Sequence, residues 1–385
     1  MPDVGIITYH APYNFGSALQ ALATQKVVSS LGYDLEIIDY RLKPQLEYYG
    51  SLYRKNLGIK NYLQDLLMKP IVQQRLKRQD NYENFFRTHY KLSRFCREPE
   101  QVQDIWNDYS IIISGSDQIW NKHSNELNNC DWEYMGPYLL KGFTGRKISY
   151  ASSIGAMSQD EIKRISPLIN EFDFVSMREK QSANLVSRIS GRDDIKVVSD
   201  PTLLLTANEW REALDLTQEE KDECKGKRSY VVYYTLRRTK SLAKSLHALK
   251  AIADKLDADV RLITPFAYVP VRDKRLHYCV QYGPIEFFKA IDGAKAVITD
   301  SYHGTLFSMN LHKDLYCLCP SDGAEFRKTE ILRRMGAAPR ILQNVDEILS
   351  TTYEPIDFAF SDCYLKDLRK QSIAYLKGAL DACSA

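Results

Sequence analysis

The stretch that decides the fold is Ala296–Phe307, AVITDSYHGTLF, in which a short apolar run ends at polar residues and a new segment begins. Residues 296–299 predict a strand buried on both faces, because the run is short and rich in β-branched residues. Gly304 permits a sharp turn, and 305–310 predicts the start of a helix whose N–H groups point toward the strand end. Ligands of open α/β sheets bind beyond the carboxyl ends of the strands, so we expect an anion here. The polar residues at this strand end are Asp300, Ser301 and His303.

Further strands and helices alternate on both sides of this stretch. Residues 4–8, 19–31 and 35–39 predict a strand, a helix and a strand, with Ser17 as the helix cap and Gly32 after its end. This unit is the building block of a doubly wound parallel sheet. It has no GxGxxG motif, so no dinucleotide is indicated. The remaining predicted strands are 111–113, 148–151, 174–179 and 196–201, then 230–235, 260–264 and 297–299.

The length of 385 residues predicts two α/β domains, 1–205 and 206–360. The crossing between them begins after Leu205 or near Gly226-Lys227. Within the first domain, residues 44–98 lose the strand pattern and predict a helical insertion, with helices at 61–69 and 72–90. Most of its charge forms a solvated face; contact of its basic residues with a polyanionic or lipid-linked substrate is the alternative. A terminal helix over 361–385, capped by Ser361, is expected to pack across the domain junction.

Composition excludes several classes of protein. Lys plus Arg number 52 against 49 Asp plus Glu, which does not favour a nucleic-acid partner. The eight cysteines contain no CxxC pair, so we expect them to be reduced and buried, and we expect no metal site. No signal peptide and no apolar run of membrane-spanning length stand out. We expect a cytoplasmic protein, with peripheral contact at the inner face of the membrane still open.

The strands of the first half also end in small polar residues. Ser114–Asn121, SGSDQIWN, follows the strand at 111–113, and Ser153 and Gly155 follow the strand at 148–151. Small residues and N–H groups at a sheet edge suit close approach of a ligand. A turn with a helix cap is the equal alternative for Ser116, Asp117 and Gln118.

Seven motifs together resemble the polysaccharide pyruvyl transferase family. They are GIITYHAPYNFGSALQA at 5–21, SGSDQIWN at 114–121, YASSIG at 150–155, SMREKQS at 176–182, VSDPTLLL at 198–205, YYTLR at 233–237 and TDSYHGTLFSMN at 299–310. The resemblance spans most of the chain in the expected order and leaves out the helical insertion. It implies two facing Rossmann-like domains of the glycosyltransferase B type, with a site in the cleft between them.

The resemblance also implies a reaction. Family members transfer the pyruvyl group of phosphoenolpyruvate to a sugar and form a cyclic ketal, so phosphoenolpyruvate is the donor substrate and no cofactor is expected. The acceptor is a nucleotide- or lipid-linked glycan precursor of a surface polysaccharide. We expect His303 as general acid or phosphate partner, because a histidine pKa lies near neutral pH. Arg178 in SMRE matches the family arginine that binds the carboxylate or phosphate. The expected substrate-binding residues are Asn14, Gly16, Gly115, Ser116, Asp117, Gln118, Ser153, Arg237, Asp300, Ser301, Tyr302, Gly304 and Arg327.

The chain departs from the family at one position. Many members carry Arg-x-His where this chain has Ser301-Tyr302-His303. A missing guanidinium removes an anion contact of roughly 1.5–3 kcal/mol. Either Arg237, Arg238 or Arg327 replaces it, or the donor is a nucleotide sugar and the protein is a glycosyltransferase. A non-catalytic carbohydrate-binding assembly protein is the third hypothesis.

Each expected site residue has a structural alternative. His303 could bond a strand-end carbonyl, and Arg178 could form an ion pair with Glu179 or Asp200. Asn14 and Gly16 could only cap the first helix, and Arg237 could be a solvated charge. Oligomeric state, acceptor sugar and ketal stereochemistry have no signal in the sequence.

Overall fold

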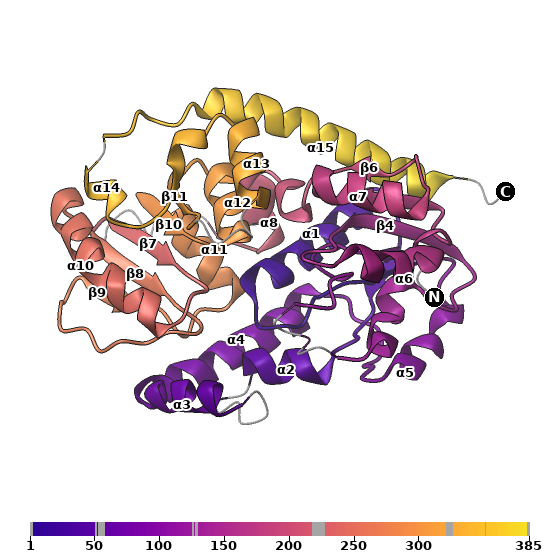
Figure 1. Ribbon diagram of the computed structural model, residues 1–385, viewed down its shortest axis with the longest axis horizontal. Coiled ribbons are helices and arrows are strands. Elements are labelled where there is room, and N and C mark those ends of the chain that lie inside the picture. The colour runs from indigo at the N-terminus through magenta and orange to yellow at the C-terminus, as the bar shows by residue number, and fades with distance from the viewer. Residues whose placement is uncertain are drawn as a thin grey trace. The chain divides into compact units, whose positions relative to one another are not determined.

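The computed structural model describes residues 3–50, 52, 58–124, 127, 130–217, 228–320, 326–350 and 352–382. Its Cα positions divide into two compact units (Figure 1). Unit 1 is Met1–Ile59, Asn84–Leu205 and Asp367–Ala385, and unit 2 is Lys60–Glu83 and Thr206–Lys366. The middle of the helical insertion, Lys60–Glu83, therefore belongs to unit 2, although the insertion enters the chain between two strands of unit 1. The alternative boundary at Gly226-Lys227 lies outside the described residues.

Unit 1 contains a parallel sheet of six strands in the order β2-β1-β3-β4-β5-β6. Its strands are β1 (Val4–Ile7), β2 (Leu35–Ile37), β3 (Ile111–Ser114), β4 (Arg146–Ser152), β5 (Phe174–Met177) and β6 (Lys196–Val197). The helices whose bounds fall in this unit are α1 (Phe15–Ser30), α2 (Lys43–Gly50), α5 (Pro99–Gln103), α6 (Gln159–Ile169) and α7 (Lys180–Ser190). Apolar side chains from β1, β3 and β5 and from α6 and α7 form one buried cluster that fixes the sheet.

Unit 2 repeats the architecture with six parallel strands in the order β12-β11-β10-β7-β8-β9. Its strands are β7 (Tyr230–Tyr234), β8 (Asp259–Ile263), β9 (Leu276–Tyr278), β10 (Ala296–Thr299), β11 (Asp314–Leu318) and β12 (Ile341–Leu342). Its helices include α8 (Ala207–Ala213), α10 (Thr239–Leu256), α11 (Pro284–Asp292), α12 (Tyr302–Asn310), α13 (Phe326–Arg334) and α14 (Glu347–Ser350). The predicted doubly wound fold is confirmed for both halves; β9, β11 and β12 were not predicted.

Three further helices lie in the insertion or at the carboxyl terminus. They are α3 (Ile59–Leu67), α4 (Val72–His89) and α15 (Phe358–Asp381). Both helices predicted for the insertion are present within two residues of their expected ends. Helix α4 contributes residues to unit 2 up to Glu83 and to unit 1 from Asn84, and α15 changes units after Lys366. None of the helices in the described ranges is long and apolar enough to cross a membrane.

Two predicted helix caps and one cysteine prediction are wrong. Asn14, not Ser17, caps α1, because its side-chain oxygen accepts from the N–H groups of Gly16 and Ser17. Ser361 lies inside α15, which begins at Phe358. Among the described cysteines, Cys363 is exposed and Cys130 is half-buried, whereas Cys96, Cys279, Cys317 and Cys319 are buried.

Candidate active site

Each sheet has one point where the strand order reverses. In unit 1 this switch point lies between β1 and β3, and in unit 2 it lies between β7 and β10. Ligands of open α/β sheets bind beyond the carboxyl ends of the strands at such points. The predicted site residues lie mainly in the loops after these strands. The sequence therefore located one candidate site in each unit, and the two differ in chemistry.

In unit 2, the Asp300 carboxylate links the loops after β7 and β10. It accepts a hydrogen bond from the Thr235 hydroxyl and a second, of 2.9 Å, from the Leu236 N–H. Arg237 lies with its Nε 3.5 Å from Asp300 Oδ2. Burial raises the pKa of the Asp300 carboxyl above its usual range, although these hydrogen bonds and nearby cations oppose the effect. Asp300 therefore holds the two strand ends together and orients Arg237.

The start of α12 lies at the same strand end. Ser301 is its N-cap, and its hydroxyl accepts a 3.2 Å hydrogen bond from the Gly304 N–H. A Cβ on Gly304 would lie 2.7 Å from Thr299 Oγ1 and 2.9 Å from Tyr234 Cδ1, so only glycine fits. A serine cap leaves this helix start without a carboxylate, since the first turn of α12 has no acidic residue. The positive end of the helix dipole thus stays available to an anion.

His303 lies in the first turn of α12, together with Tyr302 and near Arg327. The His303 side chain is buried, and its ring contacts that of Tyr302 edge to face, with centroids 5.3 Å apart. The Arg327 guanidinium of α13 lies over the Tyr302 ring at 5.3 Å. The structure thus brings together the predicted residues Arg237, Asp300–Gly304 and Arg327 within unit 2.

Sequence reasoning missed two residues of this site, Lys328 and Tyr234, and offered a third, Arg78, only among the basic residues of the insertion. Lys328, which is 2% exposed, donates to the main-chain oxygens of Asp300 and Leu318 at 2.6 and 2.9 Å. Burial raises the pKa of the Tyr234 hydroxyl, while its hydrogen bond with Ser301 and the charge of Arg78 act in the opposite direction. Arg78 comes from α4 and lies over the Tyr82 ring at 5.4 Å. Arg78 lies outside all seven motifs, so only its positive charge indicated a role in ligand binding.

The switch point of unit 1 is filled by its own side chains. Thr8 Oγ1 donates to the Ser116 carbonyl at 3.0 Å, and Gln20 Nε2 donates to Thr8 Oγ1 at 2.9 Å. Ser17 Oγ donates to Asp117 Oδ2 at 2.8 Å. Asn14 is occupied by the α1 cap and by a 3.0 Å hydrogen bond to the Tyr49 hydroxyl. The loops after β1 and β3 are therefore bonded to each other.

Arg178 lies in a buried cluster of carboxylates at the end of β5. Its side chain is 1% exposed, and it donates to Glu179 at 2.9 Å, Asp200 at 2.8 Å and Asp117 at 3.2 Å. One guanidinium thus faces three carboxylates. The structural ion pair, kept above as the alternative, describes this geometry. The expected contact of Arg178 with a substrate anion stays a prediction.

The small residues of unit 1 also have internal roles. Gly115 has φ +130°, and a Cβ there would lie 2.1 Å from the Tyr150 carbonyl oxygen. Ser116 Oγ donates to the Ala151 carbonyl at 3.0 Å, and Ser153 Oγ accepts from the Gly155 N–H at 3.3 Å. Gln118 Oε1 accepts from Asn121 at 2.7 Å. These contacts correspond to the turn that the sequence left as an equal alternative.

A second buried charged group lies beside this switch point. His10 Nε2 lies 2.9 Å from Asp39 Oδ1, and Arg41 Nε lies 2.6 Å from the same oxygen. Burial alone would raise the pKa of Asp39, but its hydrogen bonds with His10 and Arg41 outweigh burial and hold the pKa below its usual range. The charges at the strand ends of unit 1 are therefore compensated inside the protein.

A family model for polysaccharide pyruvyl transferases matches residues 14–318. This range includes β3 of the first switch point, the whole second switch point and every predicted site residue except Arg327. The chain belongs to the polysaccharide pyruvyl transferase family. It is therefore a transferase. No curated protein sequence matches it significantly.

Solved structures that share its fold have little sequence in common with this pyruvyl transferase family member. The UDP co-structure of MnaA from S. aureus has a TM-score of 0.59 at 10% identity, covering 100% of this chain and 98% of that one. A UDP-N-acetylglucosamine 2-epimerase has a TM-score of 0.55 at 9% identity, with 100% and 99% covered. The Neisseria meningitidis UDP-GlcNAc 2-epimerase bound to UDP-GlcNAc has a TM-score of 0.54 at 10% identity, with 98% and 99% covered. These likenesses confirm a glycosyltransferase B-type fold.

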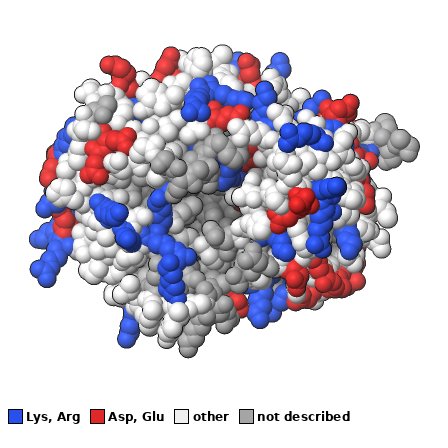
Figure 2. All heavy atoms as spheres, in the orientation of Figure 1, with Lys and Arg blue, Asp and Glu red and all other residues white. Residues whose placement is uncertain are grey.

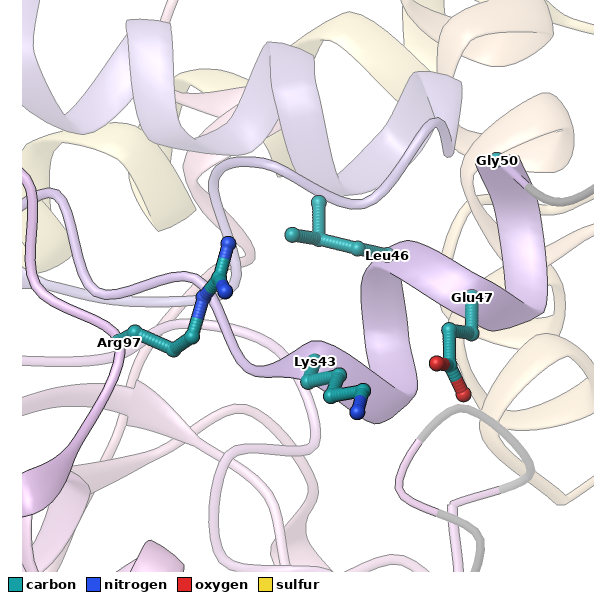
Figure 3. A pocket seen from close by; sticks show the side chains of 5 residues that line it. All are labelled: Lys43, Leu46, Glu47, Gly50 and Arg97. Atoms are coloured by element: carbon teal, nitrogen blue, oxygen red, sulfur yellow. The ribbon is translucent and has the colours of Figure 1, made fainter.

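One open cavity in unit 1 contains none of the predicted site residues. Its volume is about 340 Å³, and Lys43, Leu46, Glu47, Gly50 and Arg97 line it (Figure 3).

Basic and acidic side chains are intermixed on the face drawn in Figure 2, in agreement with the nearly balanced charge. In the ranges that the structure describes, no three His, Cys, Asp or Glu side chains come together to hold a metal ion. Anion recognition in this family member therefore depends on local clusters.

Proposed function

We propose that this protein is a ketal pyruvyltransferase that moves the pyruvyl group of phosphoenolpyruvate onto a sugar of a nucleotide- or lipid-linked glycan precursor. The observation that carries the proposal is the group of cations around the start of α12, in a chain that belongs to the pyruvyl transferase family. Phosphoenolpyruvate carries a phosphate and a carboxylate, which guanidinium groups and helix N-termini bind well.

Three arginines take the place of the family arginine that Ser301 lacks. Arg237 is oriented by Asp300, and its side chain is one-third exposed. Arg327 lies over the Tyr302 ring, and that ring contacts the ring of His303. Arg78 acts on the Tyr234–Ser301 pair from the insertion. We assign Arg237 and Arg327 to the phosphate and carboxylate of the donor. Arg78 adds positive charge near Ser301.

The reaction needs one proton donor close to the donor's methylene carbon. The first sugar hydroxyl adds to C2 while a proton reaches C3, which becomes the methyl group. The second hydroxyl then bonds to C2 as the bond from C2 to the phosphate oxygen breaks, releasing inorganic phosphate and leaving a cyclic ketal. Of the two hydroxyl protons, one replaces the proton given to C3 and the other goes to the departing phosphate. His303 is the group we assign to C3 protonation, since it lies in the first turn of α12.

The residues of unit 1 take a supporting part in this proposal. Arg178 is a positioning residue, because its guanidinium holds Asp117 and with it Ser17 at the start of α1. Asn14, Gly16, Gly115, Ser116, Gln118 and Ser153 shape the neighbouring loops. We assign the acceptor to this part of the protein, at the inner face of the membrane where surface polysaccharide precursors are assembled.

The test is incubation of the protein with phosphoenolpyruvate and a panel of nucleotide- and lipid-linked sugars, with phosphate release and product mass followed together. Coupled release and a pyruvyl mass gain, lost in His303→Gln, support the proposal. Transfer of a sugar from a nucleotide sugar, without use of phosphoenolpyruvate, would replace it by a glycosyltransferase. Sugar binding with neither reaction would make the protein a carbohydrate-binding assembly factor.

A further inference from the structure

Helix α3 presents an apolar surface to solvent. Ile59, Leu63, Leu66 and Leu67 are 78%, 55%, 41% and 60% exposed. At 3.6 residues per turn these four positions cover one arc of roughly 100°. They make up four of the nine large hydrophobic side chains that are exposed in the described part of the chain, so exposure of this kind is concentrated on one short helix. A helix of a globular protein normally turns such a stripe inward.

The opposite side of α3 is the one that packs against the rest of unit 2. Asp65 is fully buried, and Met68, just past the end of the helix, is 1% exposed. Met68 and Ile71 pack with Val280 and with partly buried Tyr268 and Tyr278. The orientation of α3 is therefore fixed by its polar and carboxyl-terminal side, and the apolar stripe is held away from the core.

Basic residues accompany this stripe. Between Ile59 and Gln79 the sequence contains Lys60, Lys69, Arg75, Lys77 and Arg78, and its one acidic residue is the buried Asp65. Lys60, Lys69 and Lys77 are exposed. Lys60 lies at the edge of the apolar arc, where a long side chain can cover apolar surface and keep its charge in water. The exposed charge of this segment is therefore positive only.

We propose that Ile59, Leu63, Leu66 and Leu67, the α3 surface, dock on an anionic lipid bilayer, with Lys60 and Lys69 at the headgroups. An aliphatic stripe flanked by lysines is the pattern of helices that lie in the membrane interface. Protein interfaces instead concentrate binding energy in Trp, Tyr and Arg, which the stripe lacks. This inference deepens the membrane contact proposed above and specifies the residues that make it.

Co-sedimentation with vesicles tests the proposal. The full chain is mixed with vesicles of phosphatidylcholine alone and of phosphatidylcholine with phosphatidylglycerol, at low and high salt. We expect binding to the anionic vesicles only, and weaker binding at high salt. The double variant Leu63→Gln/Leu67→Gln should bind with an affinity at least about tenfold lower, because two leucines no longer enter the apolar phase. Lys60→Gln/Lys69→Gln should lose affinity several-fold and much of the salt dependence.

Two controls keep the outcome decisive. Phe95→Gln replaces another half-exposed hydrophobic residue, outside the α3 surface, and should bind as the wild type does. Equal vesicle binding by the leucine double variant would overturn the proposal. A dimer of the wild type and a monomer of this variant in analytical ultracentrifugation would also overturn it, because the surface would then bind a second copy of the chain. Phosphate release with a soluble acceptor, measured on the same variants, should be unchanged. Vesicle binding without any phosphate release would contradict the proposed reaction and still support membrane binding by the α3 surface.

Discussion

The two switch points share one topology and differ in where their charges are used. In unit 1, the Arg178 guanidinium is enclosed by three carboxylates, and the loops after β1 and β3 bond to each other. In unit 2, a single buried carboxylate, Asp300, ties the loops together while arginines gather around the start of α12. A motif residue at a strand end can thus build the scaffold or meet a ligand. Its partners decide which.

The largest expected effect belongs to His303. The conservative variant His303→Gln should lower kcat for pyruvyl transfer about 10²–10⁴-fold, because the proton for C3 loses its donor. Thermal unfolding checks that the fold is intact. His312→Gln, at an exposed histidine just after α12 that pairs with Asp362, is the matched control and should keep wild-type kcat. Full activity in His303→Gln would remove the catalytic role from unit 2.

Arg178→Met should act on stability. Removing the guanidinium leaves Asp117, Glu179 and Asp200 buried without their shared cation, which costs about 3–5 kcal/mol in the free energy of unfolding. Denaturant unfolding measures this loss. Arg188→Met, at an exposed position of α7, should change stability by less than about 0.5 kcal/mol. A stable Arg178→Met protein that no longer binds phosphoenolpyruvate would reverse the roles we assign to the two switch points.

Arg237→Ala and Arg327→Ala should each weaken donor binding. A charge-assisted hydrogen bond contributes roughly 1.5–3 kcal/mol, so KM for phosphoenolpyruvate should rise about 10- to 100-fold in each variant. Steady-state kinetics at saturating acceptor provides the measurement. Arg333→Ala removes an exposed arginine from the same helix as Arg327 and should leave KM unchanged. Unchanged KM in both site variants would show that the donor anion binds elsewhere.

The smallest expected effects are opposite pH dependences of stability. The Asp39 pKa is lowered by folding, so its contribution is present above the unfolded pKa of about 3.9 and is lost as pH falls through the folded value. The Asp300 pKa is raised, so ionisation of Asp300 penalises the folded state as pH rises above about 3.9.

Urea unfolding of Asp39→Asn and Asp300→Asn over a pH series compares the two carboxylates. The deficit of Asp39→Asn relative to the wild type should shrink toward low pH. The deficit of Asp300→Asn should instead grow toward low pH. Trends of the same sign in both variants would contradict the contrast between the units.

Local patterns were enough to predict the fold. The β-branched run at 296–299 predicted β10, and helical spacing predicted α3 and α4 close to their observed ends. The helix caps were harder, because Asn14 and Ser17 are both good cap residues and the choice depends on where the backbone leaves β1. Ser361 failed for a related reason, since α15 begins three residues earlier.

The site was predictable only where its partners are close in sequence. The motif at 299–310 predicted the helix after β10, because strand, cap and helix follow one another, but α12 begins at Tyr302, three residues before the expected start, and Gly304 lies inside it. Lys328 and Arg78 reach the site from α13 and α4, so no spacing in the sequence connects them to Asp300. The role of Arg178 likewise depends on Asp117 and Asp200, which lie 61 and 22 positions away.

Hydrogen–deuterium exchange with and without phosphoenolpyruvate tests most directly which switch point holds the donor. The account predicts added protection at 235–238 and 301–305, at the ends of β7 and β10, and no change at 114–118 and 176–179. Protection confined to 114–118 and 176–179 would contradict it, because the donor would then bind at the carboxylate-rich switch point of unit 1.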